Sequence, residues 1–306
     1  MKRMLLLTVT LLMLATSTAV LALSPSPRIH LLVPPGSAAY DDLAKAIRHA
    51  LSHLQPVVDV IITSPAELSG QPLPAAQDLL IAIGDPVLPW ARSDANRFQH
   101  TLNFLVSSTA YEATEPPQPM TSALFRDQPL RRQLALAQLL IPSVNRVVML
   151  LDQYAVPPDF AELQQQSRVR FSVLEIASQP QWPQALSQLM TTHDVLLAQD
   201  DPDIYNRSTV RPVLLTTYHH GKVMIGPNRA FVEAGSFASV YSSSEQHLRQ
   251  LTRMVQQFLA EGVLPPPQFP KEFSVIINHH VAAALRLRVP GETTLAHQLY
   301  ALEKQR

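Results

Sequence analysis

The sequence predicts an α/β fold built of two Rossmann-like lobes, each with a parallel sheet. The first observation is an alternation of short apolar segments with longer amphipathic ones, which is typical of strands joined by crossover helices. The second is a polar, proline-containing stretch at 112–119 that splits this alternation into two blocks. The third is the length of 306 residues, which favours two domains. A single large doubly wound domain is the alternative that the pattern leaves open.

Short apolar runs predict four strands in the first block. They are Arg28–Val33, Val57–Thr63, Asp78–Ile83 and Thr101–Val106. Between the first two, residues 38–54 place their apolar side chains on one face and predict a helix. A second helix is expected to begin at Gly84-Asp85-Pro86, directly after the third strand.

The second block begins with a helix predicted over Leu130–Leu140, which stops before Pro142. The strands expected after it are Arg146–Leu151, Phe171–Ile176, Asp194–Ala198 and Lys222–Ile225. The helices expected among them cover 158–166, 182–190 and 207–218. A long helix, Ser244–Ala260, is followed by Gly262 in the position usual beyond a C-terminus.

A final strand, Phe273–Ile277, follows a proline-rich connector. Its late position predicts that the chain returns to the first lobe at its end. We therefore expect residues 26–125 and 265–306 in the first lobe, and residues 126–264 in the second.

Residues 1–22 have the layout of a secretory signal peptide. Lys2 and Arg3 precede an apolar stretch that is short for a membrane span, and small residues offer cleavage after Ala19 or Ala22. An uncleaved anchor is the alternative. The chain contains no cysteine, which excludes disulfides and lipoprotein attachment. We therefore expect an exported, periplasmic protein that is not a lipoprotein.

Composition and motifs argue against several other classes of protein. The formal net charge is zero and no basic stripe occurs, so nucleic acid is not an expected partner. Glycine-rich phosphate loops and the G-x-S-x-G elbow of hydrolases are missing, so neither an enzyme nor a cofactor is expected. The pairs His219-His220 and His279-His280 lack the i,i+3 or i,i+4 spacing of metal ligands, and no metal site is predicted.

Several segments, taken in order, resemble one family of exported proteins. They are Pro129–Pro142 leading into Arg146–Leu150, Asp200–Tyr205, Val232–Tyr241, Phe273–Asn278 and Ala282–Pro290. They are similar to ABC-transporter substrate-binding proteins of the tryptophan/tyrosine type, which share the type I periplasmic-binding-protein fold. The resemblance is clear from about residue 120 onward. The chain departs from the family at Thr121-Ser122 and at Arg286, where the family commonly has glycine.

The resemblance implies a ligand held between the lobes, at the carboxyl ends of strands and at helix N-termini. The candidate binding residues of the first lobe are Ser37, Asp85, Ser107, Ser108 and Thr109. Those of the second lobe are Asp200, Asp201, Tyr205 and Asn228, with Arg229 beside them. The alternative is local, because serine, aspartate and asparagine at such positions also cap helices and close turns. Asn278 is expected only to cap a helix.

The resemblance further implies an exported solute-binding protein of an ABC transporter, which closes on a small organic solute such as an amino acid. Its expected partner is a membrane permease, and the protein itself is expected to be a monomer. The alternative is a periplasmic ligand-sensing protein that signals to a membrane sensor kinase or cyclase. A structural or assembly protein that has lost its ligand is a third reading.

Overall fold

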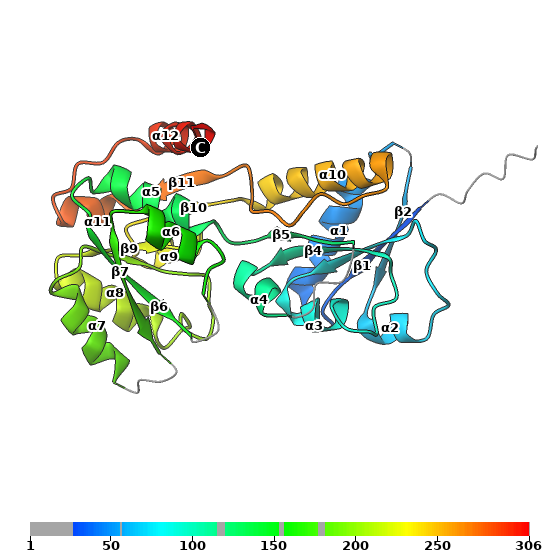
Figure 1. Ribbon diagram of the computed structural model, residues 1–306, viewed down its shortest axis with the longest axis horizontal. Helices are drawn as coiled ribbons and strands as arrows, with labels where there is room; N and C mark the ends of the chain where they lie inside the picture. The colour runs from blue at the N-terminus through cyan, green and yellow to red at the C-terminus, as the bar shows by residue number, and fades with distance from the viewer. Residues whose placement is uncertain (1–26, 56, 115–119, 153–155, 177–180, 306) are drawn as a thin grey trace, which may run out of the picture.

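Figure 1 shows two α/β lobes, each built around its own sheet and joined by segments that run between them. The computed structural model describes residues 27–305 apart from 56, 115–119, 153–155 and 177–180. The expected signal peptide and part of the 112–119 stretch lie outside these residues. Within the described part of the chain, no helix is both long and apolar enough to span a membrane.

The sheet of the first lobe has five parallel strands in the order β2-β1-β3-β4-β5. The strands are β1 (Arg28–Leu32), β2 (Asp59–Thr63), β3 (Leu79–Ile83), β4 (His100–Val106) and β5 (Thr121–Phe125). The shorter helices of this lobe are α2 (Pro65–Ser69), α3 (Leu88–Ala91), which follows the 3₁₀ turn Asp85–Val87, and α4 (Ser108–Ala113). Sequence reasoning missed β5, because this strand has only five residues and lies between the polar stretch 112–119 and the bend at 126–127.

Two long helices cover one face of this sheet. They are α1 (Ala38–Leu51) and α10 (Ser244–Glu261). The buried side chains Ile47 and Leu51 of α1 share one apolar core with Leu251, Val255 and Phe258 of α10. The opposite face of the sheet packs against α2 and α3.

The sheet of the second lobe has six strands in the order β11-β10-β9-β8-β6-β7. The strands are β6 (Arg146–Leu151), β7 (Arg170–Glu175), β8 (Val195–Leu197), β9 (Val223–Gly226), β10 (Ala238–Tyr241) and β11 (Ser274–Ile277). All neighbouring pairs are parallel except β10 and β11, which are antiparallel. The helices are α5 (Leu130–Leu140), α6 (Phe160–Gln166), α7 (Trp182–Met190), α8 (Val210–His219), α9 (Arg229–Ala234), α11 (His279–Ala284) and α12 (Glu292–Lys304).

The chain does return to the first lobe, but with 244–261 and not with the whole of 265–306 as expected. The long helix α10 packs on the first sheet, whereas β11 pairs with β10 and α12 packs on the second lobe through Leu295 and Leu299. Sequence position cannot tell which sheet an amphipathic helix covers, because either sheet offers an apolar face. The chain therefore crosses between the lobes at 126–129, at 242–243 and at 262–273 (Figure 1).

Candidate functional site

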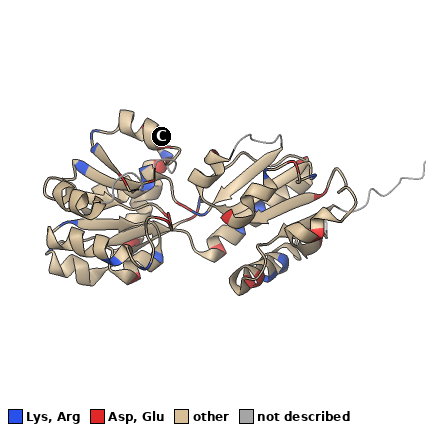
Figure 2. Ribbon diagram, turned by 90° about the horizontal axis from the view of Figure 1, so that it is seen from below, with Lys and Arg blue, Asp and Glu red and all other residues tan. Residues whose placement is uncertain are grey.

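A cavity of about 360 Å³ opens between the two lobes, where the carboxyl ends of their parallel strands meet. Its polar lining residues include five aspartates and one arginine, and Figure 2 shows charged residues of both signs close together where the lobes join. The lining residues are Asp85, Ser107, Thr109, Ala110, Ala113, Arg126, Asp152, Asp200, Asp201, Pro202 and Asp203. In an α/β protein, this end of the sheet is where a ligand usually binds.

Arg126 spans the cleft between the lobes. Its Nη1 lies 2.5 Å from Asp85 Oδ2 and its Nε lies 2.8 Å from Asp200 Oδ2. Asp85 follows β3 of the first lobe and Asp200 follows β8 of the second, so one guanidinium holds the two lobes together. Burial opposes the charge of Arg126, but the carboxylates of Asp200 and Asp85 outweigh this effect and raise its pKa.

The loop after β4 supplies the serine and threonine of the cleft. Leu105 has φ of 56° at a β-bulge opposite β5, and this irregular backbone turns the chain toward the cleft. Ser107 N then donates to Asp85 Oδ1 at 2.7 Å, and the hydroxyls of Ser107 and Thr109 lie 2.6 Å apart. Ser107 Oγ also caps α4 by accepting from Ala110 N. Cleft lining and helix capping are thus combined in one side chain.

Ser108 does not line the cleft. It is buried, its N–H donates to Asp127 Oδ1 at 2.9 Å, and its hydroxyl donates to Asp127 Oδ2. Burial raises the pKa of Asp127 to about 6, although these hydrogen bonds and the charge of Arg126 act to lower it. Ser108 therefore fixes a carboxyl group behind the cleft wall.

The second-lobe candidates have three different positions. Asp201 lines the cleft while its Oδ1 accepts from Asp203 N at 2.9 Å, as expected for the turn alternative. Tyr205 is buried against Phe231 and is absent from the cleft lining. Asn228 caps α9, and its Nδ2 lies 3.5 Å from Asp200 Oδ1, so it supports a cleft residue from behind.

Ser37 is the N-cap residue of α1 but its side chain makes no capping hydrogen bond, and it does not line the cavity. Tyr40, one turn further along, lies against Gly84 instead. Gly84 has φ of 81°, and a Cβ there would lie 2.5 Å from the Tyr40 hydroxyl. Burial is the main reason that the pKa of Tyr40 is raised, and the charges of Arg126 and Asp85 act on it as well.

Sequence reasoning missed Arg126, Asp127 and Asp152 at this site. Arg126 and Asp127 directly follow β5, and Asp152 directly follows β6. The rule that polar residues after parallel strands face the ligand would have found all three, had β5 been recognised and had the rule been applied to β6.

The two histidine pairs lie at helix ends, one at the end of α8 and one in the first turn of α11. His220 Nε2 lies 2.9 Å from Ser187 Oγ, and Asn278 caps α11 as expected, with His279 and His280 in its first turn. In the described part of the chain, no group of three or more histidine, aspartate or glutamate side chains is placed to hold a metal ion.

Comparison with solved structures identifies the architecture. The ligand-free, open structure of a substrate-binding protein with adhesive properties from Clostridium difficile superposes with a TM-score of 0.65 at 17% identity, covering 87% of this chain and 96% of that one. An ABC domain in complex with L-Trp from Streptococcus pneumoniae superposes with a TM-score of 0.55 at 15% identity, covering 89% of this chain and 98% of that one. This chain has the type I periplasmic-binding-protein fold.

A periplasmic ribose ABC transporter protein from Conexibacter woesei shares this periplasmic-binding-protein fold, with a TM-score of 0.53 at 11% identity over 89% of this chain and 98% of that one. No protein-family model matches the chain, and no curated protein matches its sequence. The fold is thus shared at low identity with proteins whose described ligands differ.

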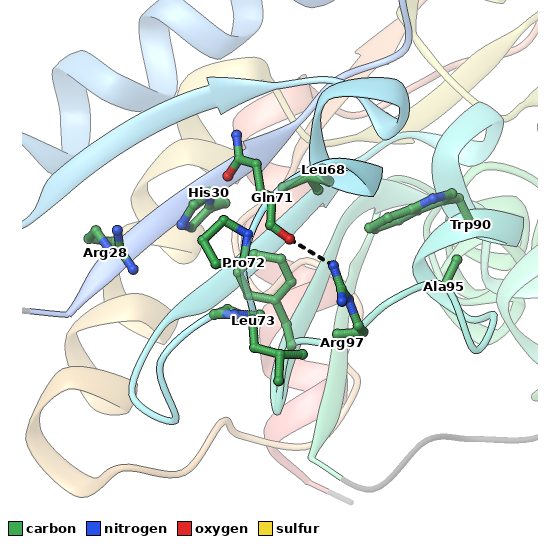
Figure 3. A pocket seen from close by; sticks show the side chains of 11 residues that line it. Arg28, His30, Leu68, Gln71, Pro72, Leu73, Trp90, Ala95 and Arg97 are labelled. Atoms are coloured by element: carbon green, nitrogen blue, oxygen red, sulfur yellow. Dashed lines mark hydrogen bonds between the residues drawn. The ribbon is translucent and has the colours of Figure 1, made fainter.

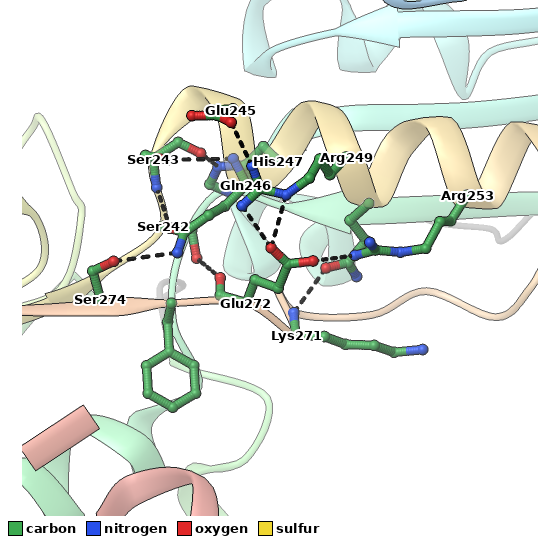
Figure 4. Close-up of polar contacts among 12 residues, drawn as sticks. Ser242, Ser243, Glu245, Gln246, His247, Arg249, Arg253, Lys271, Glu272 and Ser274 are labelled. Carbon is green, nitrogen blue, oxygen red and sulfur yellow. Dashed lines mark hydrogen bonds and ion pairs between the residues drawn. The ribbon is translucent and has the colours of Figure 1, made fainter. Parts of the chain in front are cut away.

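The lobes of this periplasmic-binding-protein fold are joined by a hydrogen-bonded hinge. Gln128 Nε2 donates to Ser242 Oγ at 2.9 Å, and Ser242 Oγ donates to the Glu272 carbonyl oxygen at 2.6 Å, so all three crossing segments are linked. Figure 4 shows the Glu272 carboxylate facing Arg249 and Arg253 of α10, with N–O distances of 2.7 Å to each. Hydrogen bonds from these two arginines lower the pKa of Glu272.

Proposed function

We propose that this chain is an exported solute-binding protein of the ABC-transporter type, which binds a small organic solute between its lobes. The observation that carries the proposal is the cleft itself: Arg126 joins Asp85 and Asp200 across it, and three further aspartates line it. The type I periplasmic-binding-protein fold supports the proposal, and so does the hinge through which the lobes can move relative to each other.

The ligand class that we propose is an amino acid, which carries an ammonium group and a carboxylate. Asp201 and Asp203 present carboxyl groups on the second-lobe side, where an ammonium group would receive charge-assisted hydrogen bonds. Arg126 is the lining residue with the planar, bidentate geometry that suits a ligand carboxylate. One chemical class of solute therefore matches both charges of the cleft.

Binding would have to compete with the contacts that the cleft already makes. A ligand carboxylate would replace Asp200 or Asp85 on Arg126, and the released carboxylate would then be available to the ligand ammonium. A solute that makes these contacts better in one lobe arrangement than in another shifts the protein toward that arrangement. We propose that a membrane permease recognises the arrangement with bound ligand, and that the protein acts in the periplasm as a monomer.

A thermal-unfolding screen of the mature chain tests this function. The proteinogenic amino acids, simple amines and neutral sugars are the three arms. A true ligand present at 100 times its dissociation constant adds about 2.7 kcal/mol to the free energy of unfolding. We expect such a shift in the amino-acid arm. A shift with sugars alone would contradict the ligand class, and no shift in any arm would contradict the function.

Two matched variants assign the effect to the cleft. Asp203→Asn removes one charge from the cleft lining and is expected to weaken amino-acid binding about tenfold, through loss of one charge-assisted hydrogen bond. Asp59→Asn makes the same change in an exposed side chain at the amino end of β2, away from the cleft, and is expected to leave affinity unchanged. Isothermal calorimetry measures both affinities. Equal affinities in the two variants would place the ligand elsewhere.

A further inference from the structure

A second, smaller cavity lies in the first lobe and shares no lining residue with the cleft. Its volume is about 50 Å³, and Figure 3 shows it between β1, the loop after α2 and the segment that follows α3. The residues that matter for its chemistry are Arg28, His30, Leu68, Trp90, Arg97 and Phe98. None of these lies at the carboxyl end of a strand, so this cavity does not belong to the cleft.

His30 is the unusual member of this lining. It is 4% exposed, yet neither Nδ1 nor Nε2 of its ring has a hydrogen-bond partner. It lies in the middle of β1, on the face where Leu32, Leu80 and Ala82 form an apolar cluster. A leucine would pack at this position without cost, whereas a buried imidazole without partners loses its hydrogen bonds to water and destabilises the fold.

The state of the His30 ring defines what it can bind. Burial lowers the pKa of His30, with Arg28 acting in the same direction and Asp78 and Asp59 opposing it, so the ring is neutral near pH 7. A neutral imidazole carries one N–H donor and one nitrogen acceptor. It can therefore donate a hydrogen bond to an anionic oxygen that enters the cavity.

Positive charge lies at the mouth of the cavity. Arg97 is exposed and donates to the Gln71 carbonyl oxygen at 2.9 Å, and the ion pairs found among the described residues do not include it. Arg28 is paired with the buried carboxylate of Asp78 at 2.9 Å. The surplus charge at this site is thus that of Arg97.

The remaining wall is apolar. Leu68, Trp90 and Phe98 line it, and the Phe98 ring meets the His30 ring edge-on with centroids 4.9 Å apart. A tetrahedral, fully hydrated anion would leave oxygens against this wall without hydrogen bonds. A carboxylate with a short alkyl tail has one polar end for His30 and Arg97 and one apolar end for the aromatic wall.

We propose that this cavity, which we name the His30 pocket, binds a small aliphatic carboxylate of the size of acetate. A cavity needs at least about 10–15 Å³ of this volume to hold a single water, so the 50 Å³ of the His30 pocket has room only for a very small ligand, of the size of acetate. The carboxylate accepts from the His30 ring N–H and is attracted by Arg97, while its methyl group contacts Trp90 and Phe98.

NMR spectroscopy of the histidine ring tests the His30 pocket. The mature protein is titrated with sodium acetate and, separately, with sodium chloride and sodium sulfate at matched ionic strength near pH 7.5. The His30→Leu variant assigns the ring signals. We expect a saturable shift of the His30 signals with acetate alone. Equal shifts with chloride or sulfate, or no saturable shift with acetate, would overturn the proposal.

Variants separate this site from general electrostatics and from the cleft. Arg97→Gln is expected to weaken acetate binding about tenfold or more, whereas Arg48→Gln, an exposed position on α1 across the sheet, leaves it unchanged. Asp203→Asn in the cleft also leaves it unchanged. Unaltered acetate affinity in Arg97→Gln would overturn the proposal, whatever the cleft binds.

The stability of His30→Leu gives a second readout. This substitution replaces an unsatisfied polar ring with an apolar side chain, so without acetate the variant is expected to melt at the same temperature as the parent or higher. Acetate raises the melting temperature of the parent only. An acetate-dependent rise of equal size in His30→Leu would place acetate elsewhere.

Discussion

Arg126 and Asp127 are neighbours in sequence but their side chains lie in different surroundings. Arg126 is held by carboxylates from both lobes, and its charge is stabilised. Asp127 lies behind the cleft wall on Ser108, and burial favours its protonated form. Both residues directly follow β5, so a short edge strand positions the central cation of the cleft and a carboxyl group with a pKa of about 6.

The raised pKa of Asp127 makes stability depend on pH in a predictable direction. Because the folded protein holds this proton up to about pH 6 and the unfolded chain releases it near 3.8, the contribution is full below pH 3.8 and is lost as pH rises through 6. Asp127→Asn removes this dependence. Relative to the parent, the variant should gain about 2 kcal/mol between pH 4 and pH 7, after allowing for partial solvent screening.

Urea unfolding of parent and variant at several pH values measures this difference. Subtracting the two curves removes the contributions of all other groups, because both proteins share them. Parallel curves over this pH range would show that Asp127 titrates in the folded protein as it does in the unfolded chain.

At the scale of elements, the hinge is the part that joins separate segments of sequence. Its three segments come from 126–129, 242–243 and 262–273, and Ser242 lies at their centre as acceptor from Gln128 and donor to the Glu272 carbonyl. The third segment also extends the first sheet, since Phe125 N donates to the Gln268 carbonyl at 3.1 Å. A single hydroxyl thus connects all three segments.

Ser242→Ala is expected to lower the free energy of unfolding by about 1 kcal/mol, because it removes two hydrogen bonds that the protein makes to one partly buried hydroxyl. Amide hydrogen exchange in 268–274 should become faster. The exposed Ser143→Ala serves as control, with a change within about 0.5 kcal/mol. Unchanged exchange at 268–274 would mean that backbone contacts alone hold the hinge.

At the scale of the whole molecule, the ion pairs of Arg126 join the two lobes across the cleft. Without this cation the cleft lining would hold five aspartates and no positive charge. Repulsion across a cleft is strongest at low salt, because added ions screen charges separated by more than about 10 Å at 0.1 M. The arrangement of the lobes should therefore respond to both Arg126 and ionic strength.

Arg126→Met is expected to increase the radius of gyration without ligand at low salt, and added salt should reduce the difference. The free energy of unfolding should fall by about 1–2 kcal/mol, since the lost pairs are only partly buried. Arg131→Met is the matched control, because it removes ion pairs within the second lobe only. Small-angle X-ray scattering measures the radius; equal values for both variants would refute a link between the lobes.

Periodicity was sufficient to predict most of the regular structure. The expected strand Arg146–Leu151 and helices Leu130–Leu140 and 182–190 agree with β6, α5 and α7, because each has a clear apolar pattern and a boundary at proline or a polar residue. Short strands such as β5, at the edge of the first sheet, and the four-residue β10 have too few residues to show a clear pattern. The partner sheet of α10 depends on contacts between residues more than a hundred positions apart, which local sequence does not encode.

For the candidate site too, local sequence predicted some of the residues and not others. Asp85, Ser107, Thr109, Asp200 and Asp201 line the cleft, and all follow strands that the sequence predicts. Ser37, Ser108, Tyr205 and Asn228 do not line it. Ser108, Tyr205 and Asn228 make local or core contacts instead, whereas Ser37 stands before α1 without a capping hydrogen bond. Which of the candidate residues contact a ligand stays a prediction.

The position of α10 has a consequence for how the chain is made. All five strands of the first lobe leave the ribosome before α10, which begins only at Ser244. Until then the sheet face that α1 covers lacks the additional cover of Leu251, Val255 and Phe258. A nascent chain therefore cannot complete its first lobe until most of its length has been synthesised. Late completion of this kind leaves the polypeptide open to chaperones for most of its synthesis.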